Sequence, residues 1–159
     1  MRLGWLITLT LLSIFTVGAY RPFVVESGGV ADPALIFLAW LALVDRWPRL
    51  LIVGFVICIY RSLGGISSAV EVVFPVAALI LSVRWFRQLL DPHHRWKRLQ
   101  ILIPALLIAS MVQEWLLAGV VPGLIFLVHG CWLSILFTAL MLPVLDLAAP
   151  LLRSARYPL

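Results

Sequence analysis

Long apolar stretches, separated by short charged or glycine-containing turns, dominate this sequence. They lack the alternation of apolar and polar positions that marks half-buried strands, so we predict helices. A membrane crossing takes about 20 residues, and the second and third stretches are short for that length. We expect these two to be half-spans or to thin the bilayer locally. The six candidate crossings lie at about residues 3–20, 31–44, 50–60, 67–83, 99–120 and 122–147.

The composition places these helices in a membrane. Hydrophobic residues make up 64% of the 159 residues and charged residues 12%, with a mean hydropathy of +1.11. Soluble domains carry about 45–50% apolar and about 25% charged residues. The few polar side chains here cannot cover a water-exposed surface, which excludes a soluble domain, a disordered chain and a disulfide scaffold. The sequence therefore predicts a single all-α domain over residues 1–159, an integral membrane protein with about six transmembrane helices.

Positive charge gathers on one set of helix ends. The formal net charge is +5, but the placement of Lys and Arg carries more information, because cytoplasmic ends are enriched in both. With six crossings, only Arg21 and Arg61 lie on the outer side, and both termini are predicted to be cytoplasmic. Cleavage of a signal peptide at 1–19 would leave five crossings with the same orientation, and we favour an uncleaved first helix. The inner cations are Arg2, Arg46, Arg49, Arg84, Arg87, Arg95, Lys97, Arg98, Arg153 and Arg156.

The longest polar segment covers residues 84–98, RWFRQLLDPHHRWKR. We interpret it as a cytoplasmic basic loop that enforces the topology and touches anionic lipid, with its tryptophans at the interface. The alternative is a docking surface for a cytoplasmic partner. His93 and His94 are adjacent and point apart on a helix, so we expect no metal site there. The cations of this basic segment are Arg84, Arg87, Arg95, Lys97 and Arg98.

Polar groups within the crossings are candidates for function because they are costly in lipid. Arg61 ends the third stretch and Glu71 begins the fourth, so they form either an interfacial pair or two separately hydrated groups. A paired charge that holds a hairpin or faces a partner helix is the functional alternative. We expect His129 to be a neutral packing residue. Asp146 lies near an inner helix end, where it reaches the cytoplasmic interface or pairs with an arginine of the basic segment.

Sequence motifs for enzyme chemistry are absent. The chain contains no HExxH, GxSxG or GxxxxGK[ST] pattern and no cluster of acids suited to Mg²⁺. Cys58 and Cys131 both lie in apolar runs and are expected to be reduced packing residues. We therefore expect a protein that is not an enzyme, with no catalytic residue, metal or cofactor.

Three segments resemble the bacterial rod shape-determining protein MreD family. Residues 33–43, PALIFLAWLAL, are similar to the early P-x-LxLLxxWAL segment of that family. Residues 54–65, GFVICIYRSLGG, are similar to its glycine-containing helix and the small-residue turn that follows. Residues 138–145, TALMLPVL, are similar to its closing TAxxxPxxxxLL motif. One departure is clear: the family usually places an aspartate near the end of the third helix, where this chain has Arg61.

The resemblance implies an inner-membrane scaffold of the cell-elongation machinery, which organises lateral peptidoglycan synthesis and cell shape. Such a subunit binds an MreC-like protein, and through it the elongation-complex synthases, while its cytoplasmic loops face an MreB-like filament. The lipid bilayer is its other partner, and no nucleic acid is expected. Small residues allow helices to approach closely in lipid. The candidate partner contacts are Gly54, Arg61, Gly64, Gly65 and Glu71.

The family also resembles the substrate-binding subunits of energy-coupling-factor transporters, which implies a compact six-helix bundle. A vitamin-binding subunit of this type is the alternative function. It needs a polar pocket near the outer leaflet. The first helix, LGWLITLTLLSIFTVGAY, lacks the Ala-x-x-x-Ala docking surface typical of that class, which lowers this alternative. Its candidate pocket residues are Arg61, Glu71, Gln113, Glu114 and Trp115.

Overall fold

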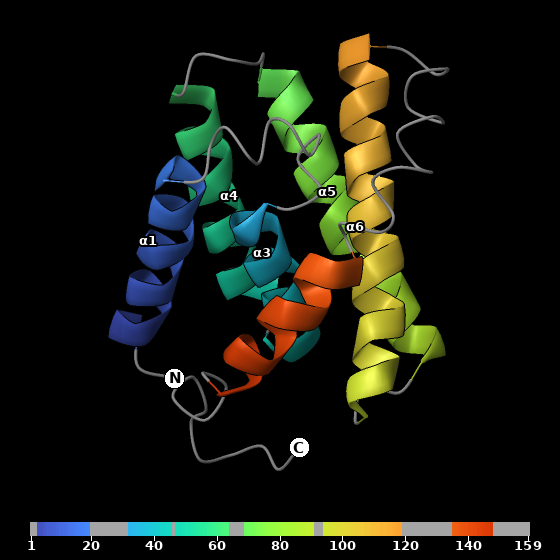
Figure 1. Cartoon of the computed structure of the whole chain (residues 1–159). Helices are drawn as coiled ribbons and strands as arrows, with labels where there is room; N and C mark the ends of the chain where they lie inside the picture. The colour runs from blue at the N-terminus through green and yellow to red at the C-terminus, as the bar shows by residue number, and fades with distance from the viewer. Residues whose placement is uncertain are drawn as a thin grey trace.

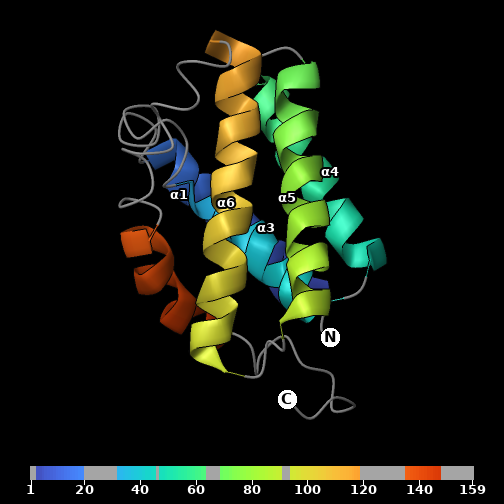
Figure 2. The same cartoon turned by 90° about the vertical axis from the view of Figure 1, so that its right-hand side faces the viewer.

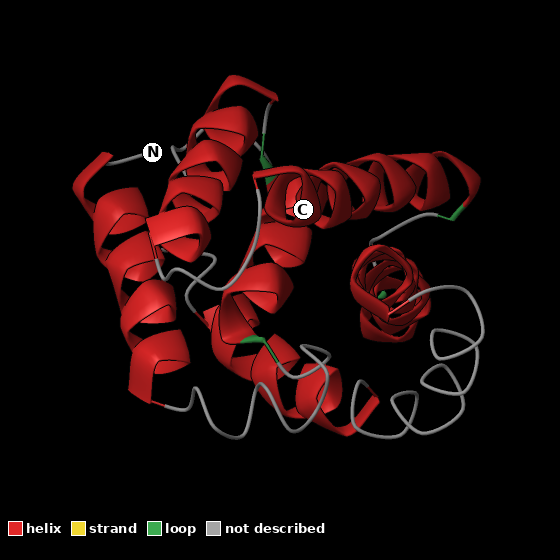
Figure 3. Cartoon of the chain, turned by 90° about the horizontal axis from the view of Figure 1, so that it is seen from above, coloured by secondary structure: helices red, strands yellow, loops and turns green. Residues whose placement is uncertain are grey.

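The computed structural model describes residues 3–19, 32–45, 47–63, 69–90, 94–118 and 135–147. As predicted, all regular structure in these residues is helical (Figure 3). Residues 122–134, the first half of the last predicted crossing, lie outside the described part of the chain. The elements are α1 (Leu3–Ala19), α3 (Pro33–Val44), α4 (Trp47–Leu63), α5 (Ala69–Leu89), α6 (Arg95–Ala118) and the C-terminal helix Ile135–Leu147.

The described helices alternate in direction along the chain and enclose α3 (Figure 1). α5 and α6 form a long antiparallel pair on one side and share the most extensive contact of the bundle (Figure 2). α1 and α4 lie on the other side, and α3 contacts all four of these helices. The C-terminal helix crosses the lower half of the bundle obliquely, near α3 and α6 (Figure 1). Consequently, the start of α1 and the end of the C-terminal helix lie at the same end.

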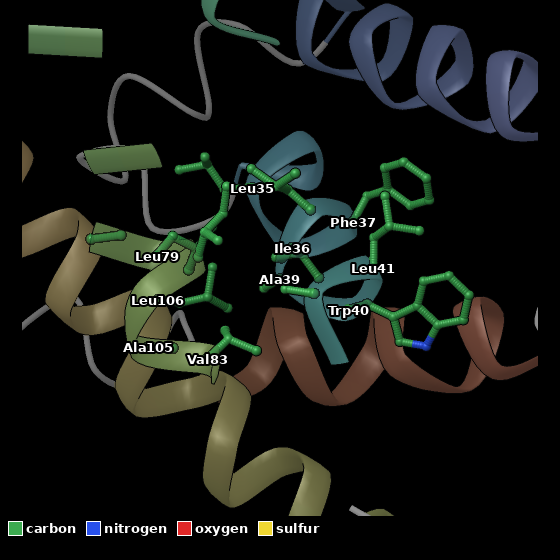
Figure 4. Packing of buried hydrophobic residues seen from close by; sticks show 14 of the residues in the cluster. Leu35, Ile36, Phe37, Ala39, Trp40, Leu41, Leu79, Val83, Ala105 and Leu106 are labelled. Atoms are coloured by element: carbon green, nitrogen blue, oxygen red, sulfur yellow. The ribbon is translucent and has the colours of Figure 1, made fainter. Parts of the chain in front are cut away.

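α3 is the core of the bundle because it has no polar face. Every side chain from Ala34 to Leu43 is buried, as expected for a helix that is apolar all round. Figure 4 shows Leu35 on the side that faces α5 and α6, whereas Phe37 and Trp40 lie on the other side. The rings of Phe37 and Trp40 stack with their centroids 6.2 Å apart. The short second stretch is thus a central helix surrounded by the others.

The lengths of the second and third helices differ from the prediction in one respect. α3 has 12 residues, about 18 Å at 1.5 Å per residue, and is short as predicted. α4 has 17 residues, as many as α1, so the prediction of a short third helix is wrong. The helix includes the charged turn at its start, because Pro48 lies in the first turn, where a missing N–H breaks no intrahelical bond.

One helix in the described residues is long and apolar enough to cross a membrane by length and composition, the Trp96–Leu116 part of α6. α3 and the C-terminal helix are apolar but shorter. At about 1.5 Å per residue, the 24 residues of α6 extend over about 36 Å. Of the two short apolar helices, α3 is enclosed by the bundle, whereas the C-terminal helix exposes Leu136, Leu140 and Val144.

The basic segment is not a loop over its predicted length. α5 continues to Leu89 and α6 begins at Arg95. Two cations of the segment lie on the last turns of α5 and three on the first turns of α6, joined by a connection at residues 90–94. The sequence RWFRQL contains no helix breaker, whereas Pro92 disfavours helix at the residue before it. The prediction of a loop at 84–98 is corrected to two helix ends and a short connection.

Candidate functional site

α3 begins inside the bundle, where Asp32 caps its first turn. The Asp32 side chain is fully buried, and its Oδ1 accepts hydrogen bonds from the backbone N–H groups of Ala34 at 2.8 Å and Leu35 at 3.4 Å. Pro33 follows at the start of the helix and has no N–H that requires an acceptor. The first N–H groups of a helix have no intrahelical partner, and burial without one costs free energy. Asp32 therefore allows α3 to start in apolar surroundings.

Arg61 neutralises this buried carboxylate. Nη2 of Arg61, on the last turn of α4, pairs with Oδ2 of Asp32. Nη1 of Arg61 donates to Oε1 of Gln113 on α6 at 3.5 Å. The Arg61 side chain is only 17% exposed, so both charges are largely removed from solvent. An unpaired buried carboxylate would be strongly destabilising. This Asp32 cluster (Asp32, Arg61 and Gln113) thus joins α3, α4 and α6 near one end of the bundle.

The position of Arg61 changes the interpretation of the expected Arg61–Glu71 pair. Arg61 turns inward, to Asp32 and Gln113, instead of toward Glu71. Glu71 is half-buried in the first turn of α5, where a carboxylate is favoured by the helix dipole. Gln113, one of the candidate pocket residues, is half-buried against Arg61. The structure thus brings Arg61 and Gln113 together, whereas Glu71 lies in the first turn of α5.

Asp32 was missing from the sequence candidates, although the sequence contains a signal for it. The predicted second crossing begins at residue 31, which places Asp32 inside an apolar stretch. An aspartate followed directly by proline and an apolar run is typical of a helix start. The partner of Asp32 has no local signal, because Arg61 is 29 positions away in the sequence.

The glycine candidates for partner contact have a different outcome. Gly54 is buried inside the bundle, where a Cβ would lie 3.5 Å from Ile80 and 3.6 Å from Val76 of α5. It therefore provides close packing of α4 on α5 within the chain and lies away from the outer surface of the bundle. Gly64 and Gly65 lie outside the described residues, as does His129.

A second polar cluster lies toward the other end of α3. Asp146 of the C-terminal helix pairs with Nη1 of Arg98 at 2.7 Å and accepts a hydrogen bond from Nε1 of Trp40 at 3.4 Å. The side chains of Arg98 and Asp146 are each 12% exposed. Of the two alternatives predicted for Asp146, the pair with an arginine of the basic segment is confirmed. This Asp146 cluster (Trp40, Arg98 and Asp146) fastens the C-terminal helix to α3 and α6.

Charged groups also hold α5 against the turn between α3 and α4. The C-cap of α3 is Asp45, which lies 3.5 Å from Nη1 of Arg49. Arg84 donates from Nη2 to the backbone carbonyl of Asp45, and its guanidinium lies 5.1 Å from the ring centroid of Trp47. Arginine over an indole ring gains a cation–π interaction. The end of α5 is therefore fixed to this turn by two contacts of one side chain.

The chemistry available to these clusters is that of ion pairing and helix capping. In the described residues, no group of three or more His, Cys, Asp or Glu side chains is placed to hold a metal ion. No protein-family model, no curated protein and no solved structure matches this chain. The function is therefore inferred from the residues and their geometry.

Proposed function

We propose that this chain is an integral membrane protein that acts as a scaffold subunit. The observation that carries the membrane assignment is the apolar outer surface of the bundle. Soluble proteins rarely expose large contiguous apolar areas, and such areas mark contact with a membrane or a partner. Side chains more than half exposed include Phe15 on α1, Phe55 on α4, Leu81 on α5 and Leu140 on the C-terminal helix. Lipid is the environment in which all four helices bury these faces.

The tryptophans support a bilayer of ordinary thickness around the bundle. Trp96 and Trp115 are exposed near the two ends of α6. Their separation of 19 positions corresponds to about 28 Å along a helix. The hydrocarbon core of a bilayer is about 30 Å thick, and tryptophan is enriched at both of its interfaces. We infer that α6 crosses the membrane between these two residues.

The short central helix fits the same proposal. A helix that starts at membrane depth is tolerated only where protein satisfies its free backbone groups. Asp32 accepts a hydrogen bond from the first turn of α3, and Arg61 balances the charge of Asp32. Since α3 is enclosed by other helices, its length does not have to match the thickness of the bilayer. We infer a bundle of about six helices in which this one does not reach both interfaces, with both termini cytoplasmic.

The polar contacts favour a scaffold over a vitamin-binding subunit. A ligand pocket needs polar groups that are available to the ligand. Arg61 and Gln113, two of the five pocket candidates, are bonded to each other, and Arg61 is also paired with Asp32. Together with the similarity to MreD, this supports an inner-membrane scaffold of the cell-elongation machinery. Its proposed partners are an MreC-like protein, the lateral-wall synthases through it, and an MreB-like filament on the cytoplasmic side.

Affinity purification from native membranes in a mild detergent tests this proposal, with mass spectrometry of both proteins and small molecules. We expect an MreC-like protein and lateral-wall synthases to co-purify. A bound vitamin-like compound, or an ATPase module in place of those partners, would move the protein to the transporter class. Recovery of the chain in the soluble fraction after cell lysis would contradict the membrane assignment itself.

A matched pair of variants connects the outcome to the surface of the bundle. Phe55→Ala removes an exposed aromatic ring from α4, whereas Ala77→Ser changes an exposed small side chain on α5. Both variants should still fold and insert, because neither site is in the core. If α4 presents its outer face to a partner helix, Phe55→Ala lowers the recovery of that partner and Ala77→Ser does not. Equal recovery from both places the partner on another face.

A further inference from the structure

We propose that two copies of this chain associate through the outer face of α6, where the side-chain amide of each Gln100 donates a hydrogen bond to the backbone carbonyl of Gln100 in the other copy. The inference rests on the membrane assignment and is independent of the scaffold role. It depends on an exposed amide at membrane depth, on a backbone carbonyl that lacks its usual donor, and on the position of both groups on one face of the helix.

Gln100 places a polar side chain on the lipid-facing side of α6. The residue is exposed and lies four positions after Trp96, about 6 Å deeper in the bilayer at the rise of an α-helix. The other exposed side chains from Trp96 to Trp115 are Ile108 and the two tryptophans themselves. The amide has no hydrogen-bond partner in the part of the chain that the structure describes. Amide side chains in membrane helices bond across to other helices, which avoids a polar group in lipid.

Pro104 leaves the backbone carbonyl of Gln100 without its helical donor. In an α-helix this carbonyl accepts a hydrogen bond from the N–H four residues later. That residue is Pro104, inside α6, and proline has no N–H. A carbonyl that meets lipid without a donor is costly, and neighbouring helices supply donors for such groups in membrane proteins. Gln100 therefore carries both a hydrogen-bond donor and an acceptor that require partners.

The two groups share one face of α6, and that face points away from the bundle. Residues 100, 104 and 108 follow each other at four-residue steps, so they line one side of the helix. Gln100 and Ile108 are exposed and Pro104 is half-buried, whereas Leu102 and Ala109 on the opposite side are buried. In Figure 2, α6 stands in front of α3, and no described helix covers the side that is turned to the viewer. The amide and the freed carbonyl are thus available to another chain.

A second copy of the chain matches this donor and acceptor without any further group. A two-fold axis along the membrane normal keeps both copies in the same orientation and places the same helix face on both sides of the interface. Each amide then meets the freed carbonyl of the other copy, and two equivalent hydrogen bonds form. Packed helices lie about 8–10 Å apart, which a glutamine side chain can bridge. Lys97 and Glu114 lie beside the two tryptophans, at the interfaces, where water and salt screen their like charges.

The other prolines inside described helices provide a contrast. Pro143 of the C-terminal helix is exposed and frees the carbonyl of Ala139, but the described exposed side chains of that helix are all apolar. Pro75 of α5 is buried in the bundle. Among the described helices, α6 is therefore the one that combines an exposed freed carbonyl with an exposed amide at the same depth.

Resonance energy transfer between labelled copies in vesicles measures the association. Full-length protein with a donor dye or an acceptor dye at its N-terminus is reconstituted in phosphatidylcholine at decreasing protein-to-lipid ratios. We expect the unmodified protein to form dimers. Gln100→Leu removes both hydrogen bonds between the copies and should lower the association constant about tenfold. Pro104→Ala returns an N–H to the carbonyl and should lower the constant by a similar factor.

Two matched variants separate this site from general effects. Gln88→Leu removes an exposed amide from α5, and Pro143→Ala restores an N–H in the C-terminal helix. We expect both to leave the association constant unchanged. If they lower it as much as Gln100→Leu and Pro104→Ala do, the proposed contact does not exist.

A second measurement locates the contact. In a chain without its two native cysteines, Ile108→Cys should cross-link two copies through a short bifunctional reagent, whereas Ile59→Cys on the exposed side of α4 should not. Cross-linking through Ile59→Cys alone overturns the proposal. An inserted but monomeric protein also overturns it and leaves this face of α6 for a different protein. Failure of the chain to insert into the vesicles would contradict the membrane assignment as well, so the two failures are distinguishable.

Discussion

The two ends of α3 are held by the same type of ion pair in different settings. At its start, the Asp32 carboxylate serves two purposes, because one oxygen caps the helix and the other pairs with Arg61. Toward its other end, Asp146 binds only side chains, those of Arg98 and Trp40. Asp32 is therefore required by the backbone of the central helix, whereas Asp146 is required for the position of one peripheral helix. Burial of a charged side chain therefore does not by itself determine its structural role.

Asp32→Ala should have the largest effect on stability. It removes a helix cap, worth about 1 kcal/mol, and leaves Arg61 without its counter-charge, for a total loss of about 3–5 kcal/mol. The free energy of unfolding in mixed detergent micelles, followed by circular dichroism, measures this loss. Asp32→Asn combined with Arg61→Gln is the control, since it keeps the cap and removes both charges. We expect this double variant to lose less than half as much free energy of unfolding as Asp32→Ala does.

Asp146→Ala should destabilise the protein by about 2–3 kcal/mol, less than the loss of a fully buried ion pair. Arg98 loses its carboxylate, but no helix cap is lost and the backbone of α3 is unaffected. The same unfolding measurement applies, together with limited proteolysis of the C-terminal helix. A loss equal to that of Asp32→Ala would mean that capping of α3 contributes nothing, and the contrast between the two ends would fail.

Trp40→Phe should cost about 1–2 kcal/mol. The substitution removes the Nε1 bond to Asp146, worth about 1 kcal/mol, and leaves a small gap in the core. A double-mutant cycle with Asp146→Ala isolates the bond from the packing. We expect a coupling free energy near 1 kcal/mol between the two positions. Strict additivity would show that the 3.4 Å contact does not stabilise the fold.

Arg49→Gln should change stability by at most about 0.5 kcal/mol, as is usual for exposed ion pairs. The Arg49 side chain is 43% exposed and its pair with Asp45 is local, within one turn. A thermal melt in detergent, compared with that of the unmodified protein, tests this. A destabilisation comparable to that of Asp146→Ala would place Asp45 among the groups that hold the bundle together.

Helix class and helix positions were predictable because they depend on local sequence. Runs of apolar residues and the prolines near helix starts are read directly along the chain. The pairing of Asp146 with an arginine of the basic segment was also predictable as one of two alternatives, because both lie at helix ends assigned to the same side. The error over residues 84–98 arose from the high charge of the segment, which does not by itself end a helix.

α1 and α3 show what the sequence determined and what only the tertiary structure decided. Neither helix contains a charged residue, and the sequence alone identified both as apolar helices. α3 is nevertheless the buried core, whereas α1 exposes Phe15 and Leu11. The difference depends on which helices surround each one. In the same way, Arg61 meets its partners Asp32 and Gln113 across 29 and 52 positions. Hydrophobic periodicity is a local property, but enclosure and ion pairing depend on contacts that exist only after the helices pack.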